Sequence, residues 1–176
     1  MTSLEYDLID EKWSEHLERF SKFKYRACIV GCHGSGKTTY LKSFERKLKT
    51  VGINSVRVFL NDESPRIFRA ISRKELKKIL VDSVLIIDGA EFISIFEWLT
   101  LSRLIRKGRG ALISSHHPLK YPVLHNCRTT PESLNRLLTK LSPPKINSRI
   151  DINNCYDRHS GNLREVFFEL YDKLAG

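Results

Sequence analysis

The sequence predicts an α/β fold in which a central parallel sheet of about five strands precedes a small group of C-terminal helices. Three observations carry this prediction. Short apolar runs recur between residues 27 and 124, as is typical of strands buried in a parallel sheet. Segments with apolar residues at helical spacing separate these runs. From Thr130 onward only helical patterns remain.

The first elements follow from this spacing. An amphipathic helix is expected at 11–24, and the first strand at Ala27–Val30. A second helix follows a glycine-rich loop and ends at Gly52, because glycine is favoured just after a helix. The next strand is expected at 53–60, where apolar residues alternate. Ser72-Arg73-Lys74-Glu75 is a capping box, which predicts that a helix with a basic outer face begins there.

Three further strands are expected at 84–87, at 111–116 and, more briefly, at 123–124. A helix at about 92–106 separates the first two of these strands. It is apolar at five positions, which are Phe92, Ile95, Phe96, Leu99 and Leu104.

The C-terminal part is expected to contain three helices. Thr130 is placed as an N-cap, with Pro131 at the first helical position. Pro143-Pro144 should end this helix, and a weaker helical segment covers 146–156. The last helix begins near 162 and keeps its apolar rhythm to 174. We therefore divide the chain into a core at 1–129 and a helical part at 130–176.

Residues 31–38 read G-C-H-G-S-G-K-T and match the phosphate-loop pattern G-x-x-x-x-G-K-[ST] without substitution. A strand, a glycine loop and a helix in this order direct backbone N–H groups and a helix N-terminus at one anion. Lys37 is expected against the β- and γ-phosphates, and the Thr38 hydroxyl is expected to bind Mg²⁺. The expected nucleotide-binding residues are Gly31, Cys32, His33, Gly34, Ser35, Gly36, Lys37, Thr38 and Thr39. The sequence therefore predicts that the chain binds a nucleoside triphosphate, and ATP is favoured because no N-K-x-D guanine motif occurs.

Asp88 ends the apolar strand at 84–87. The carboxyl ends of parallel strands form the crevice in which α/β proteins bind ligands. A carboxylate at this position is the Walker B arrangement, in which Asp88 would hold Mg²⁺.

The chain of 176 residues carries 30 Lys+Arg against 20 Asp+Glu, a net charge of +10. Such an excess favours polyanionic partners, nucleic acid first. Part of the positive charge would also serve to bind nucleotide phosphates or to keep exposed helix faces soluble. No apolar stretch has membrane-spanning length, and the polar N-terminus is unlike a secretory signal. The four cysteines form no C-x-x-C pair, so we expect free thiols and a cytoplasmic protein.

Together these motifs resemble the AAA+ class and its signalling relatives, within the ASCE division of P-loop NTPases. The resemblance covers residues 25–174 and implies a three-layer P-loop NTPase fold with a C-terminal helical lid. Ser115 or His116 falls at the position of the sensor-1 residue, and Arg164 at that of the sensor-2 arginine. Arg164 also opposes the helix dipole in the first turn of its helix, which a facing phosphate would explain.

The sequence departs from this family at three points. Gly89 stands where the family usually has the catalytic glutamate, so Glu91 is the candidate base. The loop at 118–122 is too short for a helix that carries an arginine finger; four other arginines remain as candidates, namely Arg103, Arg106, Arg109 and Arg128. The chain is also short for the class and has no evident effector domain.

Three functions remain open. The first is a slow Mg²⁺-dependent ATPase that moves its lid, 130–176, and so regulates a protein partner. The second is a nucleotide-gated protein that binds nucleic acid through Arg73–Lys78 and Arg103–Arg109 and hydrolyses little. The third is a small-molecule kinase. A zinc set of His116, His117, His125 and Cys127 is less favoured, because adjacent histidines rarely converge on one metal.

Overall fold

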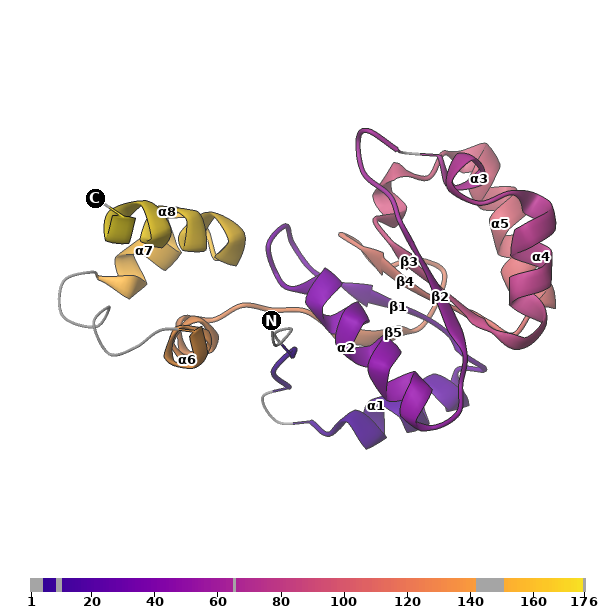
Figure 1. Ribbon diagram of the computed structural model, residues 1–176, viewed down its shortest axis with the longest axis horizontal. Coiled ribbons are helices and arrows are strands. Elements are labelled where there is room, and N and C mark those ends of the chain that lie inside the picture. The colour runs from indigo at the N-terminus through magenta and orange to yellow at the C-terminus, as the bar shows by residue number, and fades with distance from the viewer. Residues whose placement is uncertain (1–4, 9–10, 65, 142–150, 176) are drawn as a thin grey trace. The chain divides into compact units, whose positions relative to one another are not determined.

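The computed structural model describes residues 5–8, 11–64, 66–141 and 151–175. It contains a five-stranded, all-parallel sheet, so the predicted α/β fold is confirmed at this level. The strands are β1 (Arg26–Val30), β2 (Ser55–Phe59), β3 (Val84–Asp88), β4 (Ala111–Ser115) and β5 (Val123–Asn126). Their order across the sheet is β2-β3-β4-β1-β5 (Figure 1).

The helices precede, connect and follow these strands. They are α1 (Trp13–Lys22), α2 (Lys37–Thr50), α3 (Ile67–Ala70), α4 (Arg73–Asp82), the 3-10 turn η1 (Ala90–Phe92), α5 (Ile95–Lys107), α6 (Pro131–Leu141), α7 (Ile152–Arg158) and α8 (Leu163–Ala175). The chain divides into two compact units. The sheet unit comprises Met1–Val30 and Lys37–Asn126, and the C-terminal unit comprises Gly31–Gly36 and Cys127–Gly176.

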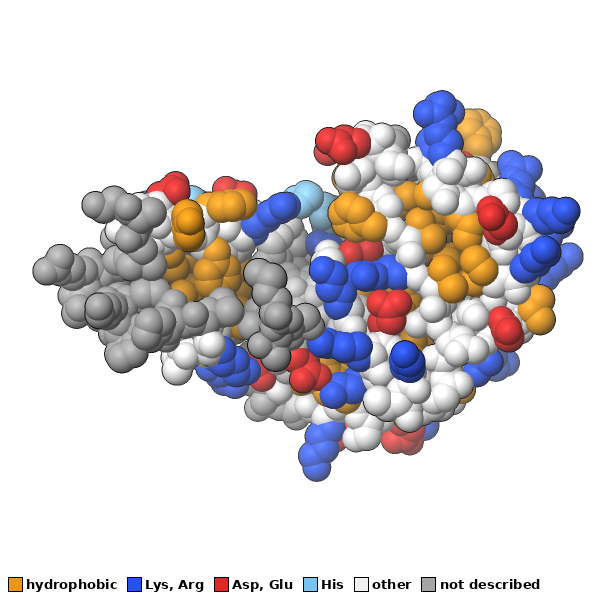
Figure 2. Space-filling view, in the orientation of Figure 1, with side chains coloured by type: hydrophobic (Ala, Val, Ile, Leu, Met, Phe, Trp, Pro, Cys, Tyr) orange, Lys and Arg blue, Asp and Glu red, His pale blue; other side chains and the backbone are white. Residues whose placement is uncertain are grey.

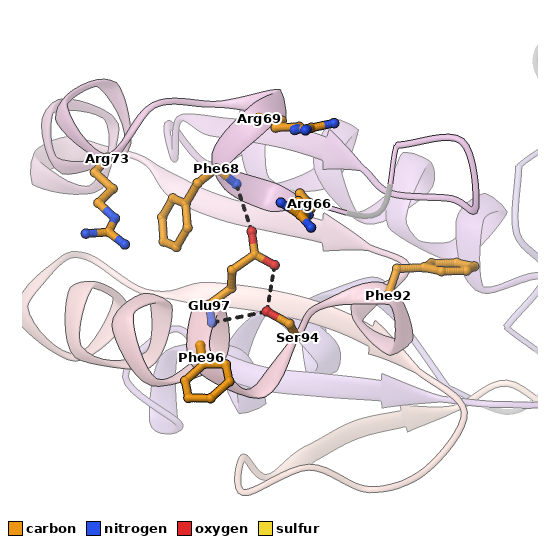
Figure 3. A pocket seen from close by; sticks show the side chains of 8 residues that line it. All are labelled: Arg66, Phe68, Arg69, Arg73, Phe92, Ser94, Phe96 and Glu97. Atoms are coloured by element: carbon orange, nitrogen blue, oxygen red, sulfur yellow. Dashed lines mark hydrogen bonds between the residues drawn. The ribbon is translucent and has the colours of Figure 1, made fainter.

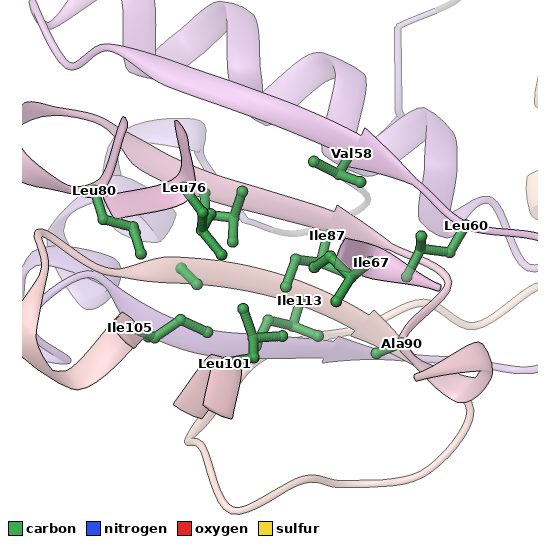
Figure 4. Close-up of a cluster of buried hydrophobic side chains, with 12 residues drawn as sticks. Val58, Leu60, Ile67, Leu76, Leu80, Ile87, Ala90, Leu101, Ile105 and Ile113 are labelled. Atoms are coloured by element: carbon green, nitrogen blue, oxygen red, sulfur yellow. The ribbon is translucent and has the colours of Figure 1, made fainter. Parts of the chain in front are cut away.

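A hydrophobic core joins one face of the sheet to α4 and α5 (Figure 4). Leu85 and Ile87 of β3 face this core, because alternate residues of a strand share a face. Leu76 from α4 and Leu101 and Ile105 from α5 are completely buried against them. α2 contacts β2, β3 and β4, and α1 packs on α2 and β5. Because all the paired strands of this sheet are parallel, their carboxyl ends lie at one edge.

Two local signals operate as the sequence predicts. The Ser72 hydroxyl accepts the Glu75 N–H, and the Glu75 carboxylate accepts the Ser72 N–H, so the capping box opens α4. The helix expected at 92–106 begins later than predicted. Residues 90–92 form the 3-10 turn, and Ser94 caps α5 by accepting the Glu97 N–H. Ile95, Phe96 and Leu99 of α5 are exposed.

The C-terminal unit has a small core of its own. The buried side chains are Leu134 and Leu138 of α6, Cys155 of α7, and Leu163, Val166 and Leu170 of α8. The Thr130 hydroxyl accepts the Ser133 N–H, as expected of the N-cap of α6. Asp151 caps α7, which starts later than the predicted segment at 146–156. Pro143-Pro144 and the first part of that segment lie outside the described residues.

Within the described ranges, the search for a helix of sufficient length and hydrophobicity to cross a membrane found no candidate.

Candidate functional site

The phosphate-loop residues lie between β1 and the start of α2. Gly34 has a φ of +69°, and a Cβ at this position would come within 3.2 Å of the Asn162 Cα atom. Only glycine therefore fits here, for both conformational and steric reasons. Ser35 is buried, whereas Cys32 and His33 are exposed. Gly34 occupies a variable position of the pattern; of the glycines that the pattern requires, Gly36 also has a positive φ, of +87°.

The helix that follows begins at Lys37. Lys37, Thr38 and Thr39 are half-buried and occupy its first turn, while Tyr40 and Leu41 anchor it in the core. No acidic side chain lies in this first turn. The positive end of the helix dipole is therefore not compensated by a carboxylate from its own first turn.

Asp88 lies at the carboxyl end of β3 and is only 4% exposed. Its Oδ1 atom accepts a hydrogen bond of 2.9 Å from the Ser114 hydroxyl of β4. Its Oδ2 atom is buried and has no hydrogen-bond partner among the described residues. A buried carboxylate with one unpaired oxygen is costly unless a cation neutralises it. The unpaired Oδ2 atom of Asp88 is therefore a suitable ligand for a hard divalent cation such as Mg²⁺.

Ser114 is a site residue that sequence reasoning missed. Its hydroxyl accepts the Gly89 N–H at 2.9 Å and donates to Asp88, and the side chain is fully buried. The strand register pairs Ile87 with Ile113, which brings Ser114 beside Asp88. The polar end of the strand at 111–116 was the available signal, but it could not indicate which hydroxyl faces Asp88.

Gly89, the departure from the family pattern, has a structural cause. Its φ is +97°, and a Cβ there would lie 3.3 Å from the Leu60 carbonyl carbon. A glutamate at this position would be strained in this backbone conformation. The chain then turns through η1, which carries Glu91.

Two predicted residues, Glu91 and His116, lie together in the structure. The His116 Nε2 atom is 3.2 Å from the Glu91 Oε1 atom. Both side chains are about three-quarters buried, with 22% and 26% of their surfaces exposed. The Ser115 hydroxyl instead donates to the His117 carbonyl at 2.5 Å. Of the two sensor-1 candidates, His116 is thus the one paired with the candidate base.

Arg164 lies in the first turn of α8 and is exposed. Its backbone N–H donates to the Asn162 Oδ1 atom at 3.2 Å. Glu165 is also exposed and is the acidic residue of this turn. At the N-terminal end of α8, polar contacts and charge therefore come from Asn162 and Glu165, which belong to the C-terminal unit.

An open pocket of about 640 Å³ lies between α3, α4 and the start of α5 (Figure 3). Its lining combines three arginines, three phenylalanines, a serine and a glutamate: Arg66, Phe68, Arg69, Arg73, Phe92, Ser94, Phe96 and Glu97. The Arg73 guanidinium lies 4.9 Å from the centre of the Phe68 ring. The sequence predicted a basic helix face that includes Arg73, and Phe92 and Phe96 as apolar positions of a helix, but not that these residues line one pocket.

No protein-family model matches the chain, and no curated protein matches its sequence.

Proposed function

We propose that this protein binds ATP through residues 31–39 and hydrolyses it slowly in the presence of Mg²⁺, as a three-layer P-loop NTPase of AAA+-like type. The observation that carries the proposal is the complete phosphate-loop pattern between a buried strand and a helix. The orphan oxygen of Asp88, at the carboxyl edge of the same parallel sheet, supports it.

The phosphate-binding residues have separate roles in this proposal. The loop amides and Lys37 would bind the β- and γ-phosphates, since oriented N–H groups and a cation stabilise concentrated negative charge. Thr38 and Asp88 would hold Mg²⁺, which supplies electrostatic stabilisation of the transferred phosphoryl group. Ser114 keeps the Asp88 carboxylate in one orientation, because it bonds one of the two oxygens.

Glu91 would accept a proton from the attacking water. The separation of 3.2 Å from His116 fixes the position of the carboxylate, and the partial exposure of both groups leaves room for solvent. Because Glu91 is on a 3-10 turn rather than directly after Asp88, we expect slower hydrolysis than a residue at position 89 would give. Arg164 would sense the γ-phosphate. The nucleotide state would then change the position of the lid, 130–176, and thereby regulate a protein partner.

The test measures ATP affinity and phosphate release for the wild type and for Lys37→Ala, Glu91→Gln and Lys42→Ala. Lys42 is an exposed lysine of the same helix and serves as the matched control. We expect Lys37→Ala to lose ATP binding, and Glu91→Gln to bind ATP while hydrolysing it at least about 10-fold more slowly. Undiminished binding by Lys37→Ala would contradict the proposal, and equal rates would exclude Glu91 as the base.

The pocket lined by three arginines and three phenylalanines between α3, α4 and α5 favours a second candidate function, the binding of single-stranded nucleic acid. Arg66 and Arg69 line this pocket and are exposed. Phe96, which lines the same pocket, is 80% exposed. Lys and Arg side chains gather over α3 and α4 next to hydrophobic ones (Figure 2). Cations that attract phosphates, next to rings on which bases stack, are the features of single-strand binding surfaces.

Part of the second predicted basic stretch, 103–109, makes contacts within the protein. Arg109 donates to the Asp82 carbonyl at 2.8 Å and lies over the Tyr25 ring. Nucleic-acid binding should therefore respond to Arg66→Ala and Phe96→Ala more than to Arg109→Ala. The measurement is fluorescence anisotropy of a labelled oligonucleotide at several salt concentrations, with ATP or ADP present. Affinity that is independent of salt and of these variants would exclude this candidate.

A further inference from the structure

Three potential metal ligands from separate segments meet in the sheet unit. They are Glu11, which precedes α1, His16 of α1, and His125 of β5. One ligand atom from each of the three lies within 4.8 Å of the others. Among the described residues, this is the one group of three or more Asp, Glu, His or Cys side chains whose ligand atoms all lie within 4.8 Å of one another.

Two imidazole nitrogens face one carboxylate oxygen. The Oε2 atom of Glu11 is 2.6 Å from His16 Nε2 and 3.5 Å from His125 Nδ1. Tetrahedral zinc with bonds of about 2.0–2.1 Å requires donor separations of about 3.3 Å. The Glu11–His125 separation of 3.5 Å is within about 0.2 Å of this value, and the Glu11–His16 pair would open by about 0.7 Å to admit the metal.

Each imidazole is oriented by a tyrosine through its other nitrogen. His16 Nδ1 is 2.6 Å from the Tyr40 hydroxyl oxygen, and His125 Nε2 is 3.2 Å from that of Tyr6. The Tyr40 and His125 rings are also stacked, with centroids 4.9 Å apart. Metal-bound histidines usually hydrogen-bond through the second nitrogen, which fixes the ring and the tautomer. Here both histidines have this outer support in the described structure.

Charged and buried groups surround the cluster. Burial lowers the pKa of His16, and it lowers the pKa of His125 to about 4. Burial alone would raise the pKa of Glu11, but hydrogen bonds from Arg19 and His16 hold it below its ordinary value. Arg19 binds the other oxygen, Oε1, at 2.7 Å. Glu15, the acidic residue in the first turn of α1, adds a further negative charge beside His16.

We propose that Glu11, His16 and His125 form a zinc site that ties the N-terminal segment and α1 to the edge strand β5. Two imidazole nitrogens and one carboxylate oxygen suit Zn²⁺ better than Mg²⁺, which prefers oxygen ligands. The Glu11 side chain is 37% exposed, so water can reach the fourth coordination position. In the zinc-bound site each imidazole would coordinate through the nitrogen that faces Glu11 and keep the nitrogen that faces its tyrosine for a hydrogen bond.

The experiment loads the full chain with Zn²⁺ in excess Mg²⁺, removes unbound metal by dialysis and measures zinc by mass spectrometry. Substitution with Co²⁺ reports the geometry through its visible absorption. We expect one zinc per chain, a rise in the unfolding temperature on zinc addition, and the intense cobalt bands of a four-coordinate site. Substoichiometric zinc together with no zinc-dependent thermal shift would overturn the proposal.

Variants identify the ligands. His125→Gln and Glu11→Gln should each weaken zinc binding at least about 100-fold, and Tyr6→Phe about 10-fold, because outer-shell groups contribute less than ligands. Glu11 is half-buried, so Glu11→Gln serves if His125→Gln does not fold. The matched control is His159→Gln, which alters a histidine–glutamate pair that also contacts Arg158 and Lys173. Zinc binding unchanged by Glu11→Gln, or lost in His159→Gln, would overturn the assignment. The assay contains no nucleotide, so its outcome is independent of ATP binding.

Discussion

Asp88 and Glu11, two carboxylates of the sheet unit, differ in how far the protein satisfies them. Asp88 is almost fully buried, yet one of its oxygens has no hydrogen-bond partner among the described residues. Glu11 is more exposed, but Arg19 binds one oxygen and His16 the other. The protein pairs both oxygens of Glu11 but only one oxygen of Asp88. The unpaired oxygen of the buried Asp88 indicates a ligand, whereas Arg19 and His16 already hold the Glu11 carboxylate in place beside the histidines.

The largest expected effect is that of Asp88→Asn. ATP turnover should fall about 100-fold, because a neutral amide holds the divalent cation poorly. Folding stability should remain constant or rise by about 1 kcal/mol, because the variant replaces a buried carboxylate by a neutral amide, which costs less to bury. Phosphate release and urea unfolding measure the two quantities. A stability loss of several kcal/mol would show that Asp88 is a structural residue.

Ser114→Ala should come next. It leaves the Gly89 N–H and one Asp88 oxygen without their partner in a buried environment, which costs about 1–3 kcal/mol. The neighbouring Ser115→Ala is the control, because its hydroxyl bonds only the carbonyl of the exposed His117. Urea unfolding of both variants tests this ranking. Equal losses would mean that the Ser114 network contributes no more than the single hydrogen bond of Ser115.

Glu11→Gln should act on stability in the opposite direction to Asp88→Asn. Without metal, we expect a loss of about 1 kcal/mol, because Arg19 and His16 lose a charged acceptor at a half-exposed position. The measurement is urea unfolding in the presence of a chelator. If both carboxylate variants shift stability in the same direction, pairing does not govern the difference between the two sites.

The smallest effect concerns Glu169, a fully paired carboxylate of the C-terminal unit. Hydrogen bonds from Lys173 and His159 hold its pKa at about 2, below its ordinary value of 4.5. A lowered carboxylate pKa stabilises the folded state above pH 4.5, and this contribution is lost as the pH falls toward 2. Thermal unfolding between pH 5 and pH 2, in wild type and Glu169→Gln, should therefore show a shallower pH dependence in the variant. Identical pH profiles would contradict this role of Glu169.

Much of the fold could be predicted because its signals are local. The apolar run at 84–87, the capping box at Ser72 and the N-cap at Thr130 each act within a few residues of the chain. The start of α5 was misplaced because a 3-10 turn and a serine cap compete with a continuous helical pattern at 90–94. The proximity of Glu91 and His116 could not be derived from spacing, because 25 residues separate them along the chain.

The sequence by itself determined the phosphate-loop pattern, the carboxylate at the end of β3 and the alternation of strands and helices, because short-range spacing encodes all three. Only the tertiary structure decided that Ser114 holds Asp88, and that two histidines and a glutamate from three segments converge. These contacts depend on strand register and helix packing. They join residues that are distant along the chain, and the burial of side chains in the common core sets that geometry.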